Sequence, residues 1–107
     1  MVSQKVDVKS LGGWFVGAFQ PRLILSDEIE VGVKNISAGT KPDGHHHKIK
    51  HEYTIVISGQ IKTSSGLIFD AGDCAYIPPL GKNDHFFPVD TIILVINTPS
   101  CQGDKYA

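Results

Sequence analysis

The chain has 107 residues, a net charge of −1 and 41% hydrophobic residues. This length suits one domain, which we expect over residues 1–107. The balanced charge excludes the basic surface that nucleic-acid binding needs, and no apolar run approaches the roughly 20 residues of a membrane-spanning helix, so we expect neither nucleic acid nor a membrane as a partner.

The first segments of the chain predict strands. Residues 11–19 combine three glycines with one tryptophan and two phenylalanines, which is typical of a bent strand and unfavourable for a helix. Residues 20–21 (Gln-Pro) end this strand, and a short apolar run follows at 23–25.

The next strand is predicted between residues 27 and 36. There Ile29, Val31 and Val33 alternate with mostly polar residues, as on a half-buried strand. The acidic residues of this segment, including Glu30, are expected to face solvent.

The second half of the chain continues as short strands separated by turns. These are predicted at 52–58, at 61–69 as a hairpin around 63–66, and at 74–77, 85–87 and 91–97. Nine or ten short strands at intervals of about ten residues, with no amphipathic helix, indicate an all-β sandwich or barrel. A barrel of about eight strands can enclose one small ligand.

The cysteines and the amino terminus indicate the compartment. Cys74 and Cys101 are too few for a disulfide framework, and the first residues lack the apolar stretch of a secretory signal. We therefore expect a reduced, cytoplasmic protein. Cys74 lies in an apolar segment and is expected to be a small core residue.

Four of the five histidines lie between residues 45 and 51. On an extended chain, His45 and His47 point to one face and His46 to the other. Two imidazoles at this spacing can be directed at one metal ion. The alternative is a solvated histidine-rich loop that binds no metal.

Glu52 can join this pair if the chain bends. A straight strand over residues 45–58 would be roughly 45 Å long, too long for this domain, so we expect a turn or bulge near 48–50. Such a break can return Glu52 to the face of His45 and His47. Two imidazoles, a carboxylate and open positions suit Fe(II), Mn(II), Ni(II) or Zn(II).

This segment resembles the first motif of the cupin superfamily, which is glycine, five residues, His-x-His, three or four residues, Glu, six residues and glycine. Every element is present, as Gly39, His45, His47, Glu52 and Gly59.

A second stretch resembles the second cupin motif more loosely. Gly72 and Pro78 match, but His85 follows Gly81 after three residues where the motif has two, and Val89 replaces the closing asparagine.

The resemblance implies a small double-stranded β-helix, the cupin-type jelly-roll barrel. It also implies a divalent metal (Fe, Mn, Ni or Zn) inside the barrel, bound by His45, His47, Glu52 and His85. A small-molecule ligand or substrate in the barrel and a dimer are further expectations.

Other candidates lie around this set. His46 is expected at the surface or at an interface. His51 is expected at the surface, or else as a partner or replacement ligand if Glu52 is misplaced. Tyr53 should pack away from the pocket, opposite Glu52, and Tyr76 is a weak catalytic candidate as an acid or base if it faces inward.

An apolar stripe predicts self-association. Tyr53, Ile55 and Ile57 lie opposite Glu52, and residues 91–97 are apolar on both sides. Because a sheet that is apolar on both faces needs a cover, we expect a homodimer that buries one outer face.

The sequence is compatible with three functions. The first is a metal-dependent isomerase, epimerase or lyase acting on a small carbohydrate-like or carbonyl-bearing metabolite. The second is a non-haem Fe(II) dioxygenase, and the third is a non-catalytic module that binds or senses a small ligand. The sequence selects neither the substrate nor the metal.

Overall fold

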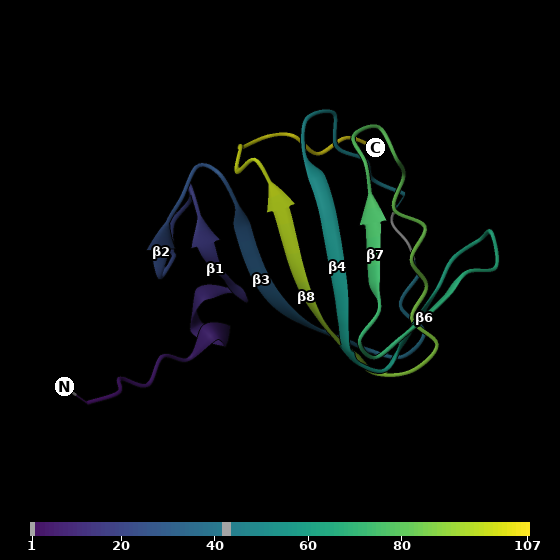
Figure 1. Ribbon diagram of the computed structural model, residues 1–107, viewed down its shortest axis with the longest axis horizontal. Helices are drawn as coiled ribbons and strands as arrows, with labels where there is room; N and C mark the ends of the chain where they lie inside the picture. Colours follow the sequence, from purple (N-terminus) through teal and green to yellow (C-terminus); the bar gives the residue numbers. More distant parts are fainter. Residues whose placement is uncertain (1, 42–43) are drawn as a thin grey trace.

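The computed structural model of the chain describes residues 2–41 and 44–107. Strands dominate this part of the chain (Figure 1). The elements are η1 (Val8–Leu11), β1 (Trp14–Gly17), β2 (Ile24–Leu25), β3 (Glu30–Ile36), β4 (His51–Ser58), β5 (Gln60–Lys62), β6 (Ile68–Asp70), β7 (Cys74–Ile77) and β8 (Thr91–Thr98). The helical element η1 has four residues, and no helix in the described ranges is long and apolar enough to cross a bilayer.

Two sheets form the barrel walls. The larger has six strands in the order β2-β1-β3-β8-β4-β7, and the smaller is the β5–β6 hairpin expected between residues 61 and 69. The strands β3, β8, β4 and β7 are all antiparallel to their neighbours. The predicted strand at 85–87 is reduced to isolated bridges, Lys62 with Phe86 and Thr40 with Phe87, which extend the smaller wall.

The two central strands alternate strictly between inside and outside. On β4, Glu52, Thr54 and Val56 are buried, and on β8 the odd-numbered residues from Thr91 to Asn97 are buried. This period of two is the signature of a sheet that lines an interior with one face. Tyr53 is therefore on the outer face, as expected from its parity with Glu52.

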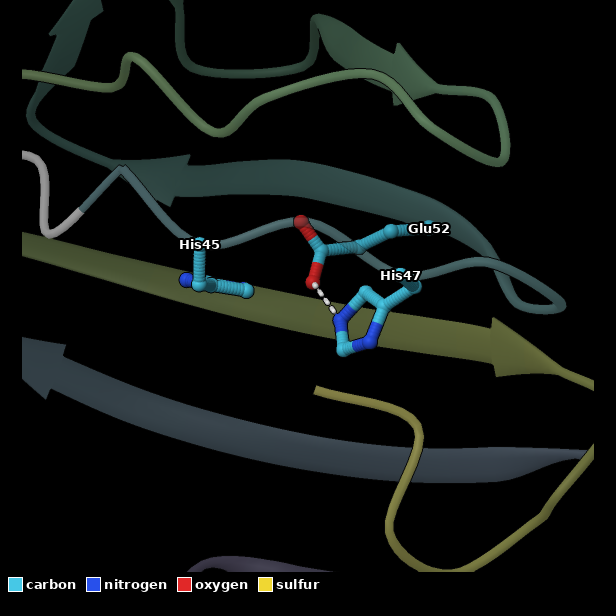
Figure 2. Close-up of side chains that lie close together, drawn as sticks. All are labelled: His45, His47 and Glu52. Atoms are coloured by element: carbon cyan, nitrogen blue, oxygen red, sulfur yellow. Dashed lines mark ion pairs between the residues drawn. The ribbon is translucent and has the colours of Figure 1, made fainter. Parts of the chain in front are cut away.

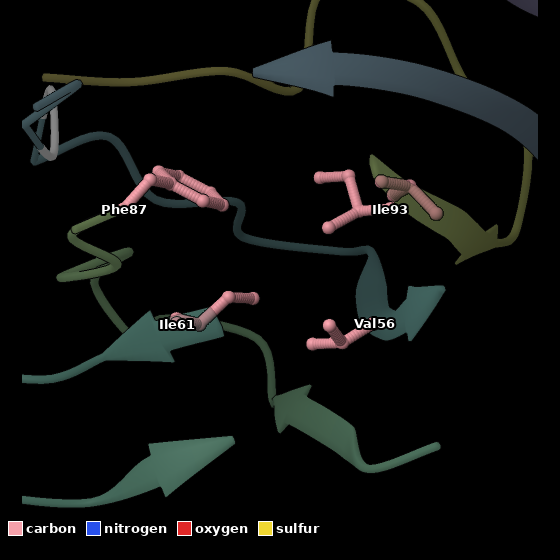
Figure 3. Packing of buried hydrophobic residues seen from close by; sticks show 5 residues of the cluster. Val56, Ile61, Phe87 and Ile93 are labelled. Atoms are coloured by element: carbon pink, nitrogen blue, oxygen red, sulfur yellow. The ribbon is translucent and has the colours of Figure 1, made fainter. Parts of the chain in front are cut away.

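The interior has an apolar end and a polar end. The apolar end is closed by a cluster from β4, β5, β8 and the 85–87 segment (Figure 3), comprising Val56, Ile61, Phe87, Ile93 and Val95. Pairing places Glu52 opposite Asn97, and Asn97 opposite Glu30, towards the other end of the same strands. Polar side chains of β3, β8 and β4 thus gather at one end of the barrel.

The structure explains the closing glycine of the first motif, Gly59. Its φ is +93°, and a Cβ atom there would lie 2.6 Å from the carbonyl oxygen of Asp90. Only glycine tolerates both the left-handed backbone and this approach. The residue therefore ends β4 beside the irregular pairing between Val56 and Ser58.

Two burial predictions were wrong. Cys74 is exposed, because the pairing of Thr54 with Ala75 places Ala75 on the inner face of β7 instead. At the start of β3, Glu30 is buried and only 5% exposed, whereas Ile29, the residue before the strand, is exposed. The apolar face of this strand is the outer one, because β3 contributes its polar face to the polar end of the barrel.

Replacing Ile61 with alanine should lower the free energy of unfolding by about 3 kcal/mol, because Ile61 is fully buried and its loss leaves a cavity. The melting temperature should fall by more than about 10 °C. Ile68→Ala, on the facing strand of the same hairpin, is the matched control: Ile68 is 54% exposed and should cost less than about 1 kcal/mol. Equal losses in thermal melts would contradict the assigned core.

Candidate metal centre

Three predicted ligands converge at the polar end of the barrel. One ligand atom each from His45, His47 and Glu52 lie within 4.8 Å of one another. Figure 2 shows Glu52 turned toward His47, with His45 beside them. The expected break is present as a bend at residues 48–49, and it places Glu52 on the same side as the two histidines.

The bend is held by a residue far along the chain. The carboxylate of Asp104 accepts hydrogen bonds from the backbone N–H groups of Lys48 (3.0 Å), Ile49 (3.0 Å) and Lys50 (2.9 Å). Burial by itself raises the pKa of the Asp104 carboxyl, but these backbone donors and the nearby His47 outweigh it, so the pKa is lowered. The buried carboxylate stays ionised and fixes three consecutive amides.

The same residue orients His47. The Nδ1 atom of His47 donates to the backbone carbonyl oxygen of Asp104, since a carbonyl can only accept. In the neutral ring the other nitrogen, Nε2, then carries the lone pair, and it lies 3.8 Å from Oε1 of Glu52. This is the arrangement in which a metal-binding histidine is usually held.

The donor set fits a divalent transition metal. Two imidazole groups and one carboxylate suit Zn(II), Fe(II), Mn(II) or Ni(II) better than Ca(II) or Mg(II), which favour oxygen donors. All three side chains are at least partly shielded, and Glu52 is buried. A third histidine would complete a four-residue set.

His85 lies in the same cavity, outside the group of three. It is buried, and it lines the cavity together with His45, His47 and Glu52. Burial lowers the pKa of His85, while the charges of Glu52 and Asp84 oppose this effect. The neutral imidazole, which is the metal-binding form, is therefore favoured.

The cavity around these residues is large enough for a small metabolite. Its volume is about 750 Å³, within the usual range for small-molecule sites. Trp14, Phe19 and Phe87 contribute aromatic surface to its wall, and the carboxy-terminal residues 101–105 form one side.

Comparison with solved structures identifies the architecture. A conserved protein with a double-stranded β-helix domain from Klebsiella pneumoniae is 22% identical, with a TM-score of 0.64 over 75% of this chain and 71% of that one. An RmlC-like cupin from Shewanella frigidimarina is 18% identical, with a TM-score of 0.64 over 73% and 72%. The chain has the cupin fold.

A third similar structure is an enzyme. Pac13 from Streptomyces, described as a nucleoside dehydratase, is 16% identical, with a TM-score of 0.67 over 77% of this chain and 69% of that one. No protein-family model and no curated protein sequence matches the chain.

Tyr76 and His51 lie outside the cavity described above. Tyr76 is 50% exposed and pairs with Tyr53 across β7 and β4, so the two rings stack at 5.0 Å on the outer face. Its hydroxyl group lies 2.7 Å from Nδ1 of His51. Neither residue lines the cavity, so the geometry does not support a catalytic role there for Tyr76 or a ligand role for His51.

The structure also gives the positions of His46 and Glu30. His46 pairs with Lys82 and Tyr106 through backbone bridges, and its ring packs 5.6 Å from that of Tyr106. Glu30 was expected in solvent, but its buried carboxylate contacts Lys50 and Asn97 inside the barrel.

Sequence reasoning missed Asp104. It is an isolated acidic residue near the end of the chain, outside both cupin motifs, and its partners lie more than fifty positions earlier. A pattern of local spacing carries no signal for such a contact.

Proposed function

We propose that this cupin is a metal-dependent enzyme, an isomerase, epimerase or lyase, that acts on a small carbohydrate-like or carbonyl-bearing metabolite. The observation that carries the proposal is the convergence of His45, His47 and Glu52 within 4.8 Å at the wall of a cavity of about 750 Å³. A divalent ion held there supplies a Lewis acid that polarises a carbonyl group or activates water.

The protein's own residues have distinct parts in this proposal. His47 presents Nε2 because Asp104 engages Nδ1, while Glu52 brings the negative charge that a divalent cation requires. His85 is the proposed fourth ligand, because it is buried and lines the same cavity. The aromatic groups of Trp14 and Phe87 supply apolar surface to the lining of the cavity.

Two alternatives use the same cavity. A non-haem Fe(II) dioxygenase fits the two-histidine, one-carboxylate donor set equally well. A module that binds or senses a small ligand without turnover needs the cavity alone. The likeness to a dehydratase, which is a lyase, supports the first proposal over these two.

Metal analysis of untagged protein tests the proposal. We expect about one zinc, manganese, nickel or iron ion per chain and turnover in a panel of small sugars and carbonyl compounds without oxygen consumption. Iron together with substrate-dependent oxygen uptake would select the dioxygenase. Thermal stabilisation by a metabolite without turnover would select the binding module, and protein that takes up no added metal would exclude both enzyme functions.

We further propose that the chain forms a homodimer through the outer face of the large sheet. Ile57 is 53% exposed there, and Ile55 and Leu94, which pair across β4 and β8, are only half-buried. A second copy would remove this apolar surface from water. Light scattering at micromolar concentration should give twice the chain mass of 11.6 kDa, and a monomer would contradict the proposal.

A further inference from the structure

A second polar cluster lies in the cavity wall beside the candidate metal centre. The carboxylate of Glu30 accepts from Lys50 Nζ (2.9 Å), Asn97 Nδ2 (3.0 Å) and Ser100 Oγ (3.1 Å). Glu30, Asn97 and Ser100 are buried, and the Lys50 side chain is only 11% exposed. We name these four residues the Lys50 cluster.

The strand register fixes the distance between this cluster and the metal centre. Glu30 on β3 lies opposite Asn97 on β8, and Asn97 lies opposite Glu52 on β4. Since neighbouring strands lie about 4.8 Å apart, the backbones at Glu30 and Glu52 are on the order of 10 Å apart. Lys50 bridges this interval, because it precedes Glu52 by two residues and reaches across to Glu30. A small molecule can therefore touch both sites.

The charge around the cavity favours an anion. Four lysines and three carboxylates line it, although the whole chain has a net charge of −1. A divalent ion in the metal centre would increase this local positive excess. A cavity with low-dielectric walls concentrates ions of the opposite sign. The lysines that line the cavity are Lys34, Lys41, Lys50 and Lys105. The carboxylates that line it belong to Glu30, Glu52 and Asp104.

Lys50 is the lysine that the structure holds in place. Its contact with Glu30 uses one of the three N–H donors of the ammonium group. Glu30 cannot move easily, because Asn97 and Ser100 hold its two carboxylate oxygens. The ammonium group is thus fixed at the cavity wall, where its other N–H groups can donate hydrogen bonds to a ligand oxygen.

We propose that Lys50 binds the carboxylate group of the ligand while another oxygen of the same molecule lies at the metal centre. The ligand class is a small carboxylic acid with a neighbouring carbonyl or hydroxyl group, such as a 2-oxo or 2-hydroxy acid. This inference rests on the proposed function, since it names the kind of carbonyl-bearing metabolite that the same cavity takes.

Pyruvate and its neutral amide, pyruvamide, test the proposal in zinc-loaded protein. The two probes have nearly the same shape and differ in charge. We expect calorimetric or NMR titration to give tighter binding of pyruvate than of pyruvamide, and Lys50→Met to weaken pyruvate binding about tenfold or more. Lys48→Met is the matched control, because Lys48 lies in the same bend but is exposed and packs on Tyr106. It should change pyruvate affinity less than twofold.

The single variant leaves the buried Glu30 without its cation, so the double variant Glu30→Gln/Lys50→Met is measured beside it. Both should lose the preference for pyruvate while binding zinc with an affinity within about threefold of the parent protein. Equal binding of the two probes by the parent, unchanged pyruvate affinity in Lys50→Met, or no pyruvate binding at millimolar concentration would overturn the proposal.

The same titrations in metal-free protein separate this proposal from the proposed function. A preference for pyruvate that depends on Lys50 without metal, in a protein that takes up no zinc, would leave the anion site standing and remove the metal-dependent enzyme. Zinc binding without any effect of Lys50 would do the reverse.

Discussion

His47→Ala should abolish stable binding of a divalent metal, with the dissociation constant for zinc raised by about 100-fold or more. The substitution removes one of three donors that lie within 4.8 Å of one another, and it also removes the ring that Asp104 orients. The other two members of this group, even with His85 in the same cavity, form a poorer site, because affinity for zinc depends on the number and geometry of the ligands. Calorimetric titration of metal-free protein measures the effect directly.

The neighbouring histidines supply matched controls for this experiment. His46→Ala and His51→Ala remove the same ring from the same segment, but His46 packs on Tyr106 and His51 on Tyr76, away from the cavity. Both variants should bind zinc with nearly the parental affinity. A His47→Ala protein that is folded by circular dichroism and keeps the parental zinc stoichiometry would refute the assigned centre.

His85 is examined in the same titration. Its absence from the group of three predicts a smaller contribution, so His85→Ala should weaken zinc binding without removing it. A loss as large as that of His47→Ala would place His85 among the primary ligands.

The strands and the convergence of His45, His47 and Glu52 could be predicted from the sequence. Alternation on β4 and β8 sets which residues face inward, and the excessive length of a straight strand required the bend that returns Glu52 to the cavity. These features depend on local periodicity and on chain geometry, which a single sequence contains.

The burial of the charged residues could not be predicted in this way. Glu30 was expected in solvent because acidic residues on a strand edge usually are, but its burial depends on Lys50, Asn97 and Ser100 from other elements. Cys74 was assigned to the core because its segment is apolar, and only the pairing with β4 shows that Ala75 has the inward parity. Asp104 likewise acquires its role through partners distant in sequence.

The residue that joins the end of the chain to the metal centre is Asp104. In Figure 1 the carboxy-terminal segment runs across the end of the large sheet beside the bend that precedes β4. Asp104 is 3% exposed and satisfies three backbone amides there, so its removal leaves buried donors without partners. Each unsatisfied group of this kind costs about 1–3 kcal/mol before relaxation.

Asp104→Ala should therefore lower the free energy of unfolding by about 2–3 kcal/mol. Zinc affinity should fall about 10-fold to 100-fold, because the bend that positions His47 and Glu52 loosens. Asp104→Asn keeps the shape and one strong acceptor oxygen, so both losses should be intermediate. Asp27→Ala, which removes an exposed carboxylate, is the control and should change neither quantity measurably.

Nitrogen NMR of His47 distinguishes a positioning role from a purely structural one. In the parent protein the neutral ring should carry its proton on Nδ1, because the Asp104 carbonyl accepts from that atom. Asp104→Ala keeps this backbone carbonyl but removes the carboxylate that holds the bend beside it. In the folded, metal-free variant we therefore expect a mixture of tautomers together with the weaker zinc binding. A variant that loses stability but retains a single tautomer and full zinc affinity would show that Asp104 supports the bend without tuning the centre.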